Sequence, residues 1–320
     1  ATVFIGYDVD SASIDAAMWE YNDLLVVFAA GNSGADREGN LQPRSLGGTG
    51  STAKNTLVVG ASGPVELDMW GSRFYLENDL LFFSSQGPTA DTRFKPEVVA
   101  PGLVFSATTD RNTVIDLGDE HDTCDHEDDN CNVDQDWPTM GTSFSSPLTA
   151  GAAVLVRQYF TDGFWLAGRS SPEAGFNPTN ALVKACVING AVPLSGVIVG
   201  MGENHPLSQP PSFEQGWGRV HLENALWFEG DQRMTLVLND SPNPVATNPM
   251  FDADLAPFPE ALEPMATGDR AAWILPHASP EALLKVTLAW SDPPAAAGTE
   301  RTLINDLDLV VTTANDDRYL

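Results

Sequence analysis

The stretch that decides the fold is Gly141-Thr142-Ser143-Phe144-Ser145-Ser146-Pro147, which leads directly into the small-residue run LTAGAAVLVRQYF at 148–160. The run predicts a long helix whose small residues suit deep burial. A serine at a helix start lies where free backbone N–H groups and the positive end of the helix dipole favour a developing oxyanion. We expect Pro147 to fall in the first turn, where its missing N–H removes no helical bond. The same pattern also fits a simpler interpretation, in which serine and threonine only cap the helix.

Helices and buried strands alternate on both sides of this stretch. Apolar runs closed by glycine or proline predict strands, and the 3.6-residue spacing predicts helices. Such alternation favours an α/β fold with a parallel sheet flanked by helices. The expected strands are LLVVFAAGNSG at 24–34, NTLVVGAS at 55–62 and KPEVVAPG at 95–102, and the expected further helices are IDAAMWEYND at 14–23 and PTNALVKACVINGA at 178–191.

The texture of the sequence changes near Gly230. Short β-branched segments follow it, separated by proline-rich or polar linkers, which is typical of an all-β region. We therefore predict two domains, an α/β domain over 1–230 and a small β sandwich or jelly-roll-like domain over 231–320. The first residues, ATVFIGYDVD, and the last, VVTTANDDRYL, have the texture of interior sequence, so both domains are expected to be incomplete. The expected β segments are RMTLVLND at 233–240, AAWILP at 271–276, LLKVTLAW at 283–290 and LDLVVTT at 307–313.

The charge excludes some classes of function. With 44 acidic and 16 basic residues, the formal net charge is -28, so phosphate backbones and anionic membranes would repel the chain. No apolar run reaches the length that spans a membrane. A strongly acidic surface suits an extracellular or saline setting, and we expect a secreted protein.

An acidic loop lies between the strand at 95–102 and Ser143. Cys124 and Cys131 are seven residues apart in it and are close enough to pair, whereas Cys186 falls in an apolar helical pattern and is expected to be a buried free thiol. His121 and His126 leave zinc open as a second possibility for this loop. Alternating oxygen-bearing side chains favour a hard cation, so we expect calcium, with a merely solvated acidic loop as the alternative. The candidate ligands are Asp128, Asn130, Asn132, Asp134 and Asp136.

A second motif narrows the interpretation of Ser143. Asn32 follows a buried strand on the glycine turn of AAGNSG at 29–34, from which a carboxamide N–H can point at a reacting carbonyl oxygen. Asparagine is also common in turns for conformational reasons alone. The order AAGN, FSSQGP at 83–88, KPEVVAPG at 95–102 and GTSFSSP resembles the subtilase family of serine proteases. The resemblance extends over roughly residues 10–228, and more weakly into a carboxyl-terminal β region like that of the larger alkaline subtilases.

The resemblance implies roles for particular residues. Ser143 matches the nucleophile that attacks a peptide carbonyl and forms an acyl-enzyme. Asn32 matches the side-chain donor of the oxyanion hole, with the backbone N–H of Ser143 as the second donor. Ala29, Ala30 and Gly31 match the strand edge that lines the primary specificity pocket. Gly50 stands where many relatives carry a proline, so their side-chain preference does not transfer.

The sequence departs from the family in its acid and base. Family members carry Asp, His and Ser in that order, with the Asp in a D-[ST]-G turn and the His in an HGT-like segment. Neither segment occurs before Asn32, and all five histidines follow it without that context. A serine without a general base is a weak nucleophile, so this chain alone is not expected to hydrolyse peptides at an enzymic rate.

Three hypotheses are therefore open. The chain is part of an endopeptidase whose Asp and His lie on upstream sequence of the same protein, or a catalytically dead, protease-like binding module, or one chain of a nicked two-chain enzyme. The intact GTS and AAGN motifs favour the first. Protein or peptide substrates and an upstream partner segment follow from it.

Overall fold

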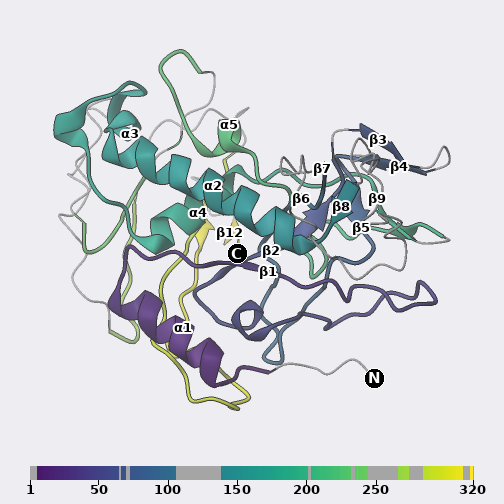
Figure 1. Cartoon of the computed structure of the whole chain (residues 1–320). Helices are drawn as coiled ribbons and strands as arrows, with labels where there is room; N and C mark the ends of the chain where they lie inside the picture. The colour runs from purple at the N-terminus through teal and green to yellow at the C-terminus, as the bar shows by residue number, and fades with distance from the viewer. Residues whose placement is uncertain are drawn as a thin grey trace, which may run out of the picture.

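The computed structural model shows an α/β unit in which the carboxyl-terminal residues run back along the amino-terminal part (Figure 1). The structure describes residues 6–64, 66–69, 73–105, 138–200, 203–231, 235, 237–243, 266–273, 284–312 and 318–319.

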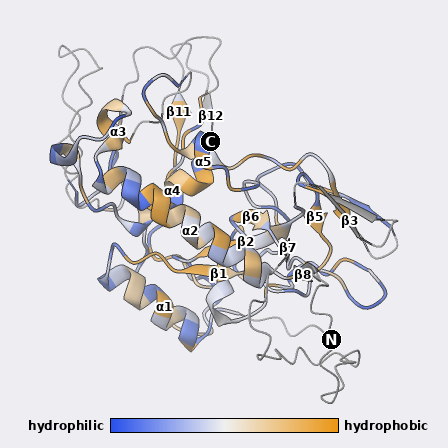
Figure 2. Cartoon of the chain, turned by 45° about the horizontal axis from the view of Figure 1, so that its top comes forward, coloured by the Kyte–Doolittle hydropathy of each residue, from blue (hydrophilic) through white to orange (hydrophobic). Residues whose placement is uncertain are grey.

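A parallel sheet forms the centre of this unit. Strand β2 (Leu57–Ser62) pairs in parallel with β1 (Val27–Ala29) on one side and with β6 (Val98–Pro101) on the other. Every residue of β2 is buried, as the unbroken apolar pattern predicts for a strand covered on both faces. The expected parallel sheet is thus confirmed, and Figure 2 shows its apolar residues gathered where the helices cross it.

Helix α2 (Thr142–Thr161) packs across β1, β2 and β6. Ala153, Val156 and Phe160 of α2 lie in the hydrophobic core, where Cys186 and Val187 from the helix at 180–190 are also buried. Our placement of Pro147 was wrong, because α2 begins at Thr142 and Pro147 lies inside the helix. Pro147 has no N–H to donate to the carbonyl four residues earlier, so the Ser143 carbonyl lacks its helical partner. The burial of the core-facing side chains keeps the helix continuous through this position.

The other long helices begin at side-chain caps. Asp8 accepts a hydrogen bond from the Ser11 amide at 2.8 Å before α1 (Val9–Glu20), and Thr179 accepts one from the Leu182 amide at 3.1 Å before α4 (Asn180–Gly190). Such caps satisfy amides that have no partner within the helix. Among the described residues, no helix is long and apolar enough to cross a bilayer.

The described residues of the carboxyl-terminal region leave the expected β domain a prediction. Within 284–312, only Val311–Thr312 is a strand, paired with Arg318–Tyr319. Several backbone amides of this region bond to side chains; those of Ile304 and Asn305, which lie between two of the expected β segments, bond to Asp292. The residues are extended along the α/β unit, and the boundary near 230 stays a prediction.

The other helices and strands are α1 (Val9–Glu20), η1 (Thr49–Ser51), β3 (Glu66–Met69), β4 (Arg73–Leu76), β5 (Leu80–Leu81), β7 (Leu103–Phe105), β8 (Pro138–Met140), α3 (Phe164–Ala167), η2 (Pro172–Ala174), α4 (Asn180–Gly190), β9 (Val197–Val199), β10 (His205–Pro206), α5 (Leu222–Ala225), β11 (Val311–Thr312) and β12 (Arg318–Tyr319).

Candidate active site

Ser143 is the second residue of α2, and its side chain is exposed. The helix start is fixed to the sheet on both sides of it. The Gly141 amide donates to the Gly102 carbonyl at 2.8 Å, and the buried hydroxyl of Ser145 donates to the Ala100 carbonyl at 2.9 Å. An exposed hydroxyl is thereby presented by a rigid first turn.

Asn32 is held against the same turn. Its Oδ1 accepts hydrogen bonds from the Thr142 amide at 2.9 Å and from the Thr142 hydroxyl at 3.0 Å. That hydroxyl also accepts a hydrogen bond from the Gly31 amide at 3.1 Å. Because both partners of Asn32 bind its oxygen, its Nδ2 group is left to donate elsewhere.

The space beside Gly141 faces both predicted donors. A methyl group on Gly141 would lie 3.4 Å from Nδ2 of Asn32 and 3.7 Å from the backbone nitrogen of Ser143. The amide of Ser143 belongs to the first turn, where N–H groups have no helical partner. An oxygen atom in this space would therefore meet two N–H groups from separate parts of the chain.

Ala29, Ala30 and Gly31 directly precede Asn32, and the Gly31 amide is bound to the Thr142 hydroxyl. The Gly47 amide donates to the Ala30 carbonyl at 2.7 Å, so residues 45–51 lie directly against this edge. They are called the cleft wall below, because the family resemblance implies that the position of Gly50 shapes the wall of the substrate pocket. Gly31 has a φ of +105°, and a Cβ there would approach the Gly47 nitrogen to 2.8 Å. Both the backbone conformation and the close approach require glycine.

At Gly50 the cleft wall has no side chain, because the ring of Phe28 fills the space that a side chain would need. A Cβ on Gly50 would lie 2.4 Å from Phe28 Cδ2, and one on Gly48 would lie 3.2 Å from Cε1 of the same ring. The glycine that stands in place of a proline is thus matched by a phenylalanine from β1.

The structure brings no described histidine to Ser143. His205 lies in β10 and His221 directly precedes α5. The other three histidines lie outside the described residues. The structure therefore assigns no general base.

The predicted metal and disulfide residues, Asp128, Asn130, Asn132, Asp134 and Asp136 with Cys124 and Cys131, lie outside the described residues. In the described ranges, no group of three or more His, Cys, Asp or Glu side chains is arranged to hold a metal ion. Cys186 is buried in α4 as a free thiol, as expected. Burial raises its pKa to about 12, so it is not a reactive thiolate near neutral pH.

Sequence reasoning missed two residues of the site. Thr142 anchors Asn32, and Phe28 supports the cleft wall. The GTS motif draws attention to Ser143 and gives Thr142 only a capping role, although a hydroxyl next to a predicted helix start was a usable signal. Phe28 reads as an ordinary residue of a buried strand, and no local signal marks its contact with Gly50.

Comparison with protein families agrees with this geometry. A model of the subtilase family matches residues 4–218. The match covers more than half of the chain and includes Asn32 and Ser143. The chain belongs to the subtilase family, a class of serine peptidases.

The chain is also similar to several curated proteins. Serine protease/ABC transporter B family proteins tagD and tagB of Dictyostelium discoideum are each 28% identical to it over 262 residues. These matches cover 76% and 78% of this chain but only 14% and 13% of the two relatives. Serine protease AprX of Bacillus subtilis (strain 168) is 29% identical over 140 residues, which are 43% of this chain and 27% of AprX. The chain therefore spans a small part of the length of the relatives that it matches.

Proposed function

We propose that the chain is part of the catalytic region of a secreted serine endopeptidase that cleaves proteins through an acyl-enzyme on Ser143. The hydroxyl oxygen of Ser143 attacks the peptide carbonyl, its proton passes to a base and then to the departing amine, and water releases the acyl group. The observation that carries the proposal is the space beside Gly141, which both Asn32 Nδ2 and the Ser143 amide face.

The geometry suits the stabilisation of an oxyanion. Both N–H groups are fixed before any substrate binds, one by the bonds of Thr142 to Asn32 and the other by the first turn of α2. Preorganised donors stabilise a tetrahedral intermediate without reorganising as the reaction proceeds. The positive end of the helix dipole acts in the same direction. A helix cap alone gives no reason for a second donor from a turn 110 residues away.

We further propose that the acid and base of the triad come from sequence of the same protein preceding Ala1. The exposed face of α2 supports this. Val154 is 64% exposed, and Leu148 and Leu155 are each 50% exposed, although α2 is the central helix. Together with Ser143, Pro147 and Gly151 they follow helical spacing and form one stripe that begins at the nucleophile.

The sheet supports the same proposal. Strand β1 pairs with β2 along one edge, and no other described strand pairs with its opposite edge. Unpaired strand edges and exposed apolar stripes mark places where further protein packs. A segment that covered both would pass beside Ser143.

Serine-directed labelling tests the proposal. The full-length protein is expected to react with a fluorophosphonate, and Ser143→Ala is expected to abolish the reaction. Ser33→Ala is the matched control, since Ser33 is also an exposed serine next to Asn32. Residues 1–320 alone are expected to label poorly. Robust peptide hydrolysis by residues 1–320 would contradict the upstream base.

The alternative function is a protease-like binding module that lacks catalysis. It predicts that the full-length protein does not label at Ser143 under any condition in which it is folded. Asn32→Ala separates the two functions further. In the peptidase it lowers the rate of acylation by about 10²–10³, the loss known for this donor in subtilisin itself. In a binding module it leaves affinity for a folded partner unchanged.

A further inference from the structure

Lys54 is a buried cation whose partners come from the far end of the chain. Its Nζ lies 2.6 Å from Asp292 Oδ2 and 3.0 Å from the Thr302 carbonyl, and it also donates to the Pro293 carbonyl. The side chains of Lys54 and Asp292 are both only 2% exposed. A buried ammonium needs such partners, because an unpaired charge in the interior is strongly destabilising.

Asp292 joins the two parts of the chain. Its carboxylate accepts hydrogen bonds from the amides of Ile304 and Asn305, which close residues 292–305 into a loop. Residues 285–305 are called the C-terminal strap below. Its own amide donates to Asn55 Oδ1 at 2.8 Å, and its carbonyl accepts from Asn55 Nδ2 at 2.9 Å. Lys54 and Asn55 are thus both fixed by one residue of the strap.

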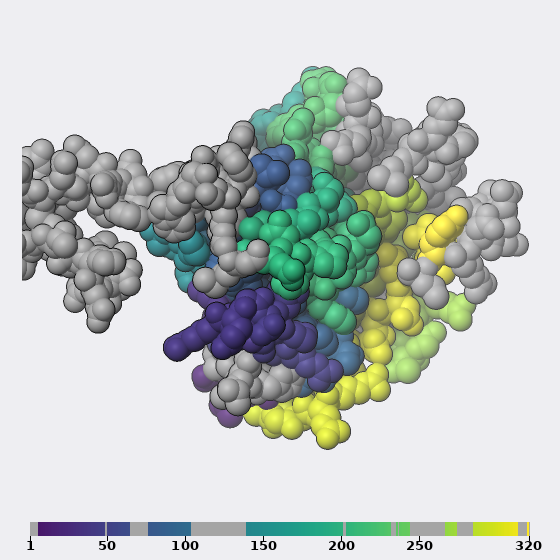
Figure 3. All heavy atoms as spheres, turned by 90° about the vertical axis from the view of Figure 1, so that its right-hand side faces the viewer, coloured from purple at the N-terminus to yellow at the C-terminus, as the bar shows by residue number. Residues whose placement is uncertain are grey.

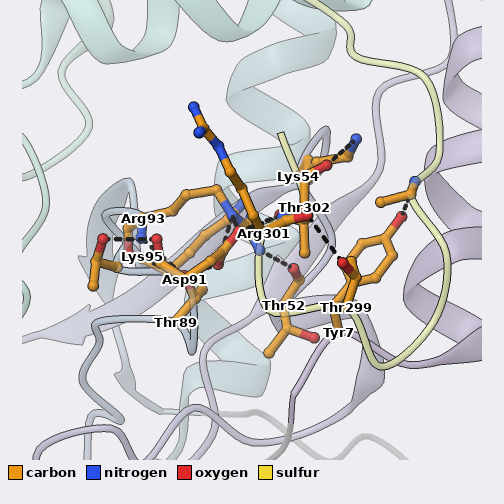
Figure 4. Close-up of polar contacts among 12 residues, drawn as sticks. Tyr7, Thr52, Lys54, Thr89, Asp91, Arg93, Lys95, Thr299, Arg301 and Thr302 are labelled. Atoms are coloured by element: carbon orange, nitrogen blue, oxygen red, sulfur yellow. Dashed lines mark hydrogen bonds and ion pairs between the residues drawn. The ribbon is translucent and has the colours of Figure 1, made fainter. Parts of the chain in front are cut away.

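A second contact lies beside the first. Asp91 accepts hydrogen bonds from the amide and the hydroxyl of Thr302, and both of its oxygens are bound by Arg93 Nε at 3.0 and 2.9 Å. Arg93 in turn donates to the Thr52 carbonyl at 2.8 Å (Figure 4). The strap is therefore attached to residues 52–55 directly through Lys54 and indirectly through Arg93.

Residues 52–55 continue directly from the cleft wall. The Thr56 hydroxyl donates to the Gly50 carbonyl at 3.0 Å, so the wall folds back onto the anchored residues. The other end of the wall meets the Ala30 carbonyl through Gly47. The strap lies on the surface beside the early part of the chain (Figure 3), and its contact at Lys54 is three residues beyond the end of the wall.

We propose that the C-terminal strap positions the cleft wall for substrate, with Lys54 and Asp292 as positioning residues. This inference rests on the proposed peptidase function. Neither side chain contacts the reacting atoms. They determine where Gly48 and Gly50 stand relative to the Ala29–Gly31 edge. Since a small displacement of a binding element is enough to slow a reaction strongly, loss of the strap contact is expected to weaken peptide binding and leave the nucleophile intact.

Two probes on the full-length protein test the inference. A small alkyl fluorophosphonate reacts with Ser143 without using the cleft wall, whereas a peptidyl diphenyl phosphonate must first bind along it. Asp292→Asn is expected to lower the rate constant for the peptidyl probe by about tenfold relative to that for the alkyl probe. Hydrogen exchange at the amides of 45–51 is expected to accelerate in the same variant.

Asp306→Asn is the matched control. It removes the same charge from the strap region but breaks only an exposed ion pair with Arg301, so the ratio of the two rate constants is expected to stay constant. If Asp292→Asn does not fold, Thr302→Val removes the hydroxyl bond to Asp91 while keeping the carbonyl that binds Lys54, and a smaller shift in the same direction is expected.

An unchanged ratio and unchanged exchange at 45–51 in folded Asp292→Asn would overturn the inference. Failure of the wild type to react with either probe would instead overturn the proposed peptidase function. In that case exchange at 45–51 still decides whether the strap positions the wall.

Discussion

The carboxamide oxygen of Asn32 accepts two hydrogen bonds from Thr142, one from its backbone amide at 2.9 Å and one from its hydroxyl at 3.0 Å. The residue before the proposed nucleophile thus sets the orientation of the proposed oxyanion donor. We therefore expect the hydroxyl of Thr142 to act in the proposed reaction through its hydrogen bond to Asn32.

Thr142→Val is expected to slow acylation of Ser143, because it removes the hydroxyl bond and leaves Asn32 held by one amide. We expect a loss of about tenfold, which corresponds to about 1.4 kcal/mol. Fluorophosphonate labelling rates of the full-length protein give the measurement. Thr142→Ser keeps the hydroxyl and is expected to retain most of the rate; an equal loss in both variants would show that packing, and not the hydrogen bond, matters.

Gly141→Ala is expected to fill the space that both donors face. The added methyl group would lie 3.4 Å from Asn32 Nδ2, where an oxyanion needs to bind. Acylation is expected to fall at least about a hundredfold, comparable with the loss of one donor. Gly6→Ala, which lies outside α2 and has nothing within 4 Å of its added Cβ, serves as the control and should keep full activity. Retained activity in folded Gly141→Ala would place the oxyanion elsewhere.

Gly50→Ala is expected to destabilise the cleft wall. Its methyl group would lie 2.4 Å from the ring of Phe28, and overpacking of this kind costs about 1–3 kcal/mol. Denaturant unfolding of the variant checks the cost. Combining Gly50→Ala with Phe28→Leu makes room for the methyl group, so the double variant should be more stable than the sum of the single changes predicts. Simple additivity would show that the ring does not limit this position.

Lys95 is expected to make the free energy of unfolding depend on pH between about pH 7 and about pH 10. Its Nζ lies 2.6 Å from Glu97 Oε1, an oxygen that Lys184 also binds at 2.7 Å. Burial lowers the pKa of Lys95 to about 7, and the charges of Lys184 and Arg93 act in the same direction against Glu97. Above about pH 7 the unfolded chain therefore holds a proton at this site that the folded chain has released.

Where the unfolded state binds more protons, the free energy of unfolding rises with pH, here by at most about 1.4 kcal/mol per pH unit up to about pH 10. Below about pH 7 both states are protonated, and the term is constant. The stability of the wild type relative to Lys95→Met is expected to increase over this range in urea titrations. Exposed Arg37→Met should show no such trend, and a flat difference for Lys95→Met would contradict the lowered pKa.

Calcium and a Cys124–Cys131 bridge remain predictions from the sequence. If the alternating side chains of the acidic loop bind calcium, millimolar calcium should raise the melting temperature relative to chelator by mass action. Replacing Asp128 and Asp134 by Asn should remove the shift. Mass spectrometry of oxidised, native protein should find the two cysteines joined; free thiols would rule out the bridge.

The sequence predicted the central sheet because parallel strands buried on both faces have a recognisable apolar pattern. β2 and β6 lie in apolar runs that end near glycine or proline, and such runs predict buried strands. The limits of α2 were harder to predict. Proline normally ends or begins a helix, whereas Pro147 lies inside one whose core-facing side chains are deeply buried.

Ser143 and Asn32 could be proposed from the sequence because each stands at a signalled boundary, a helix start and a glycine turn. That two residues 111 positions apart belong to one site was implied only by the family resemblance. The contact between Lys54 and Asp292 spans 238 residues and has no periodic pattern on either side. Long-range polar pairs of this kind depend on the folded geometry, so local sequence carries no sign of them.

The ammonium group of Lys54 has one more consequence. Many proteins fix a distant segment with a bound metal, which a chelator can remove. Here the cation is a side chain of the polypeptide, so every molecule carries it and dialysis cannot remove it. Enclosed by Asp292, Pro293 and Thr302, this amine is also out of reach of acylating reagents while the fold persists. The reactivity of the Lys54 amine toward acylating reagents therefore reports when residues 292–302 have separated from Lys54.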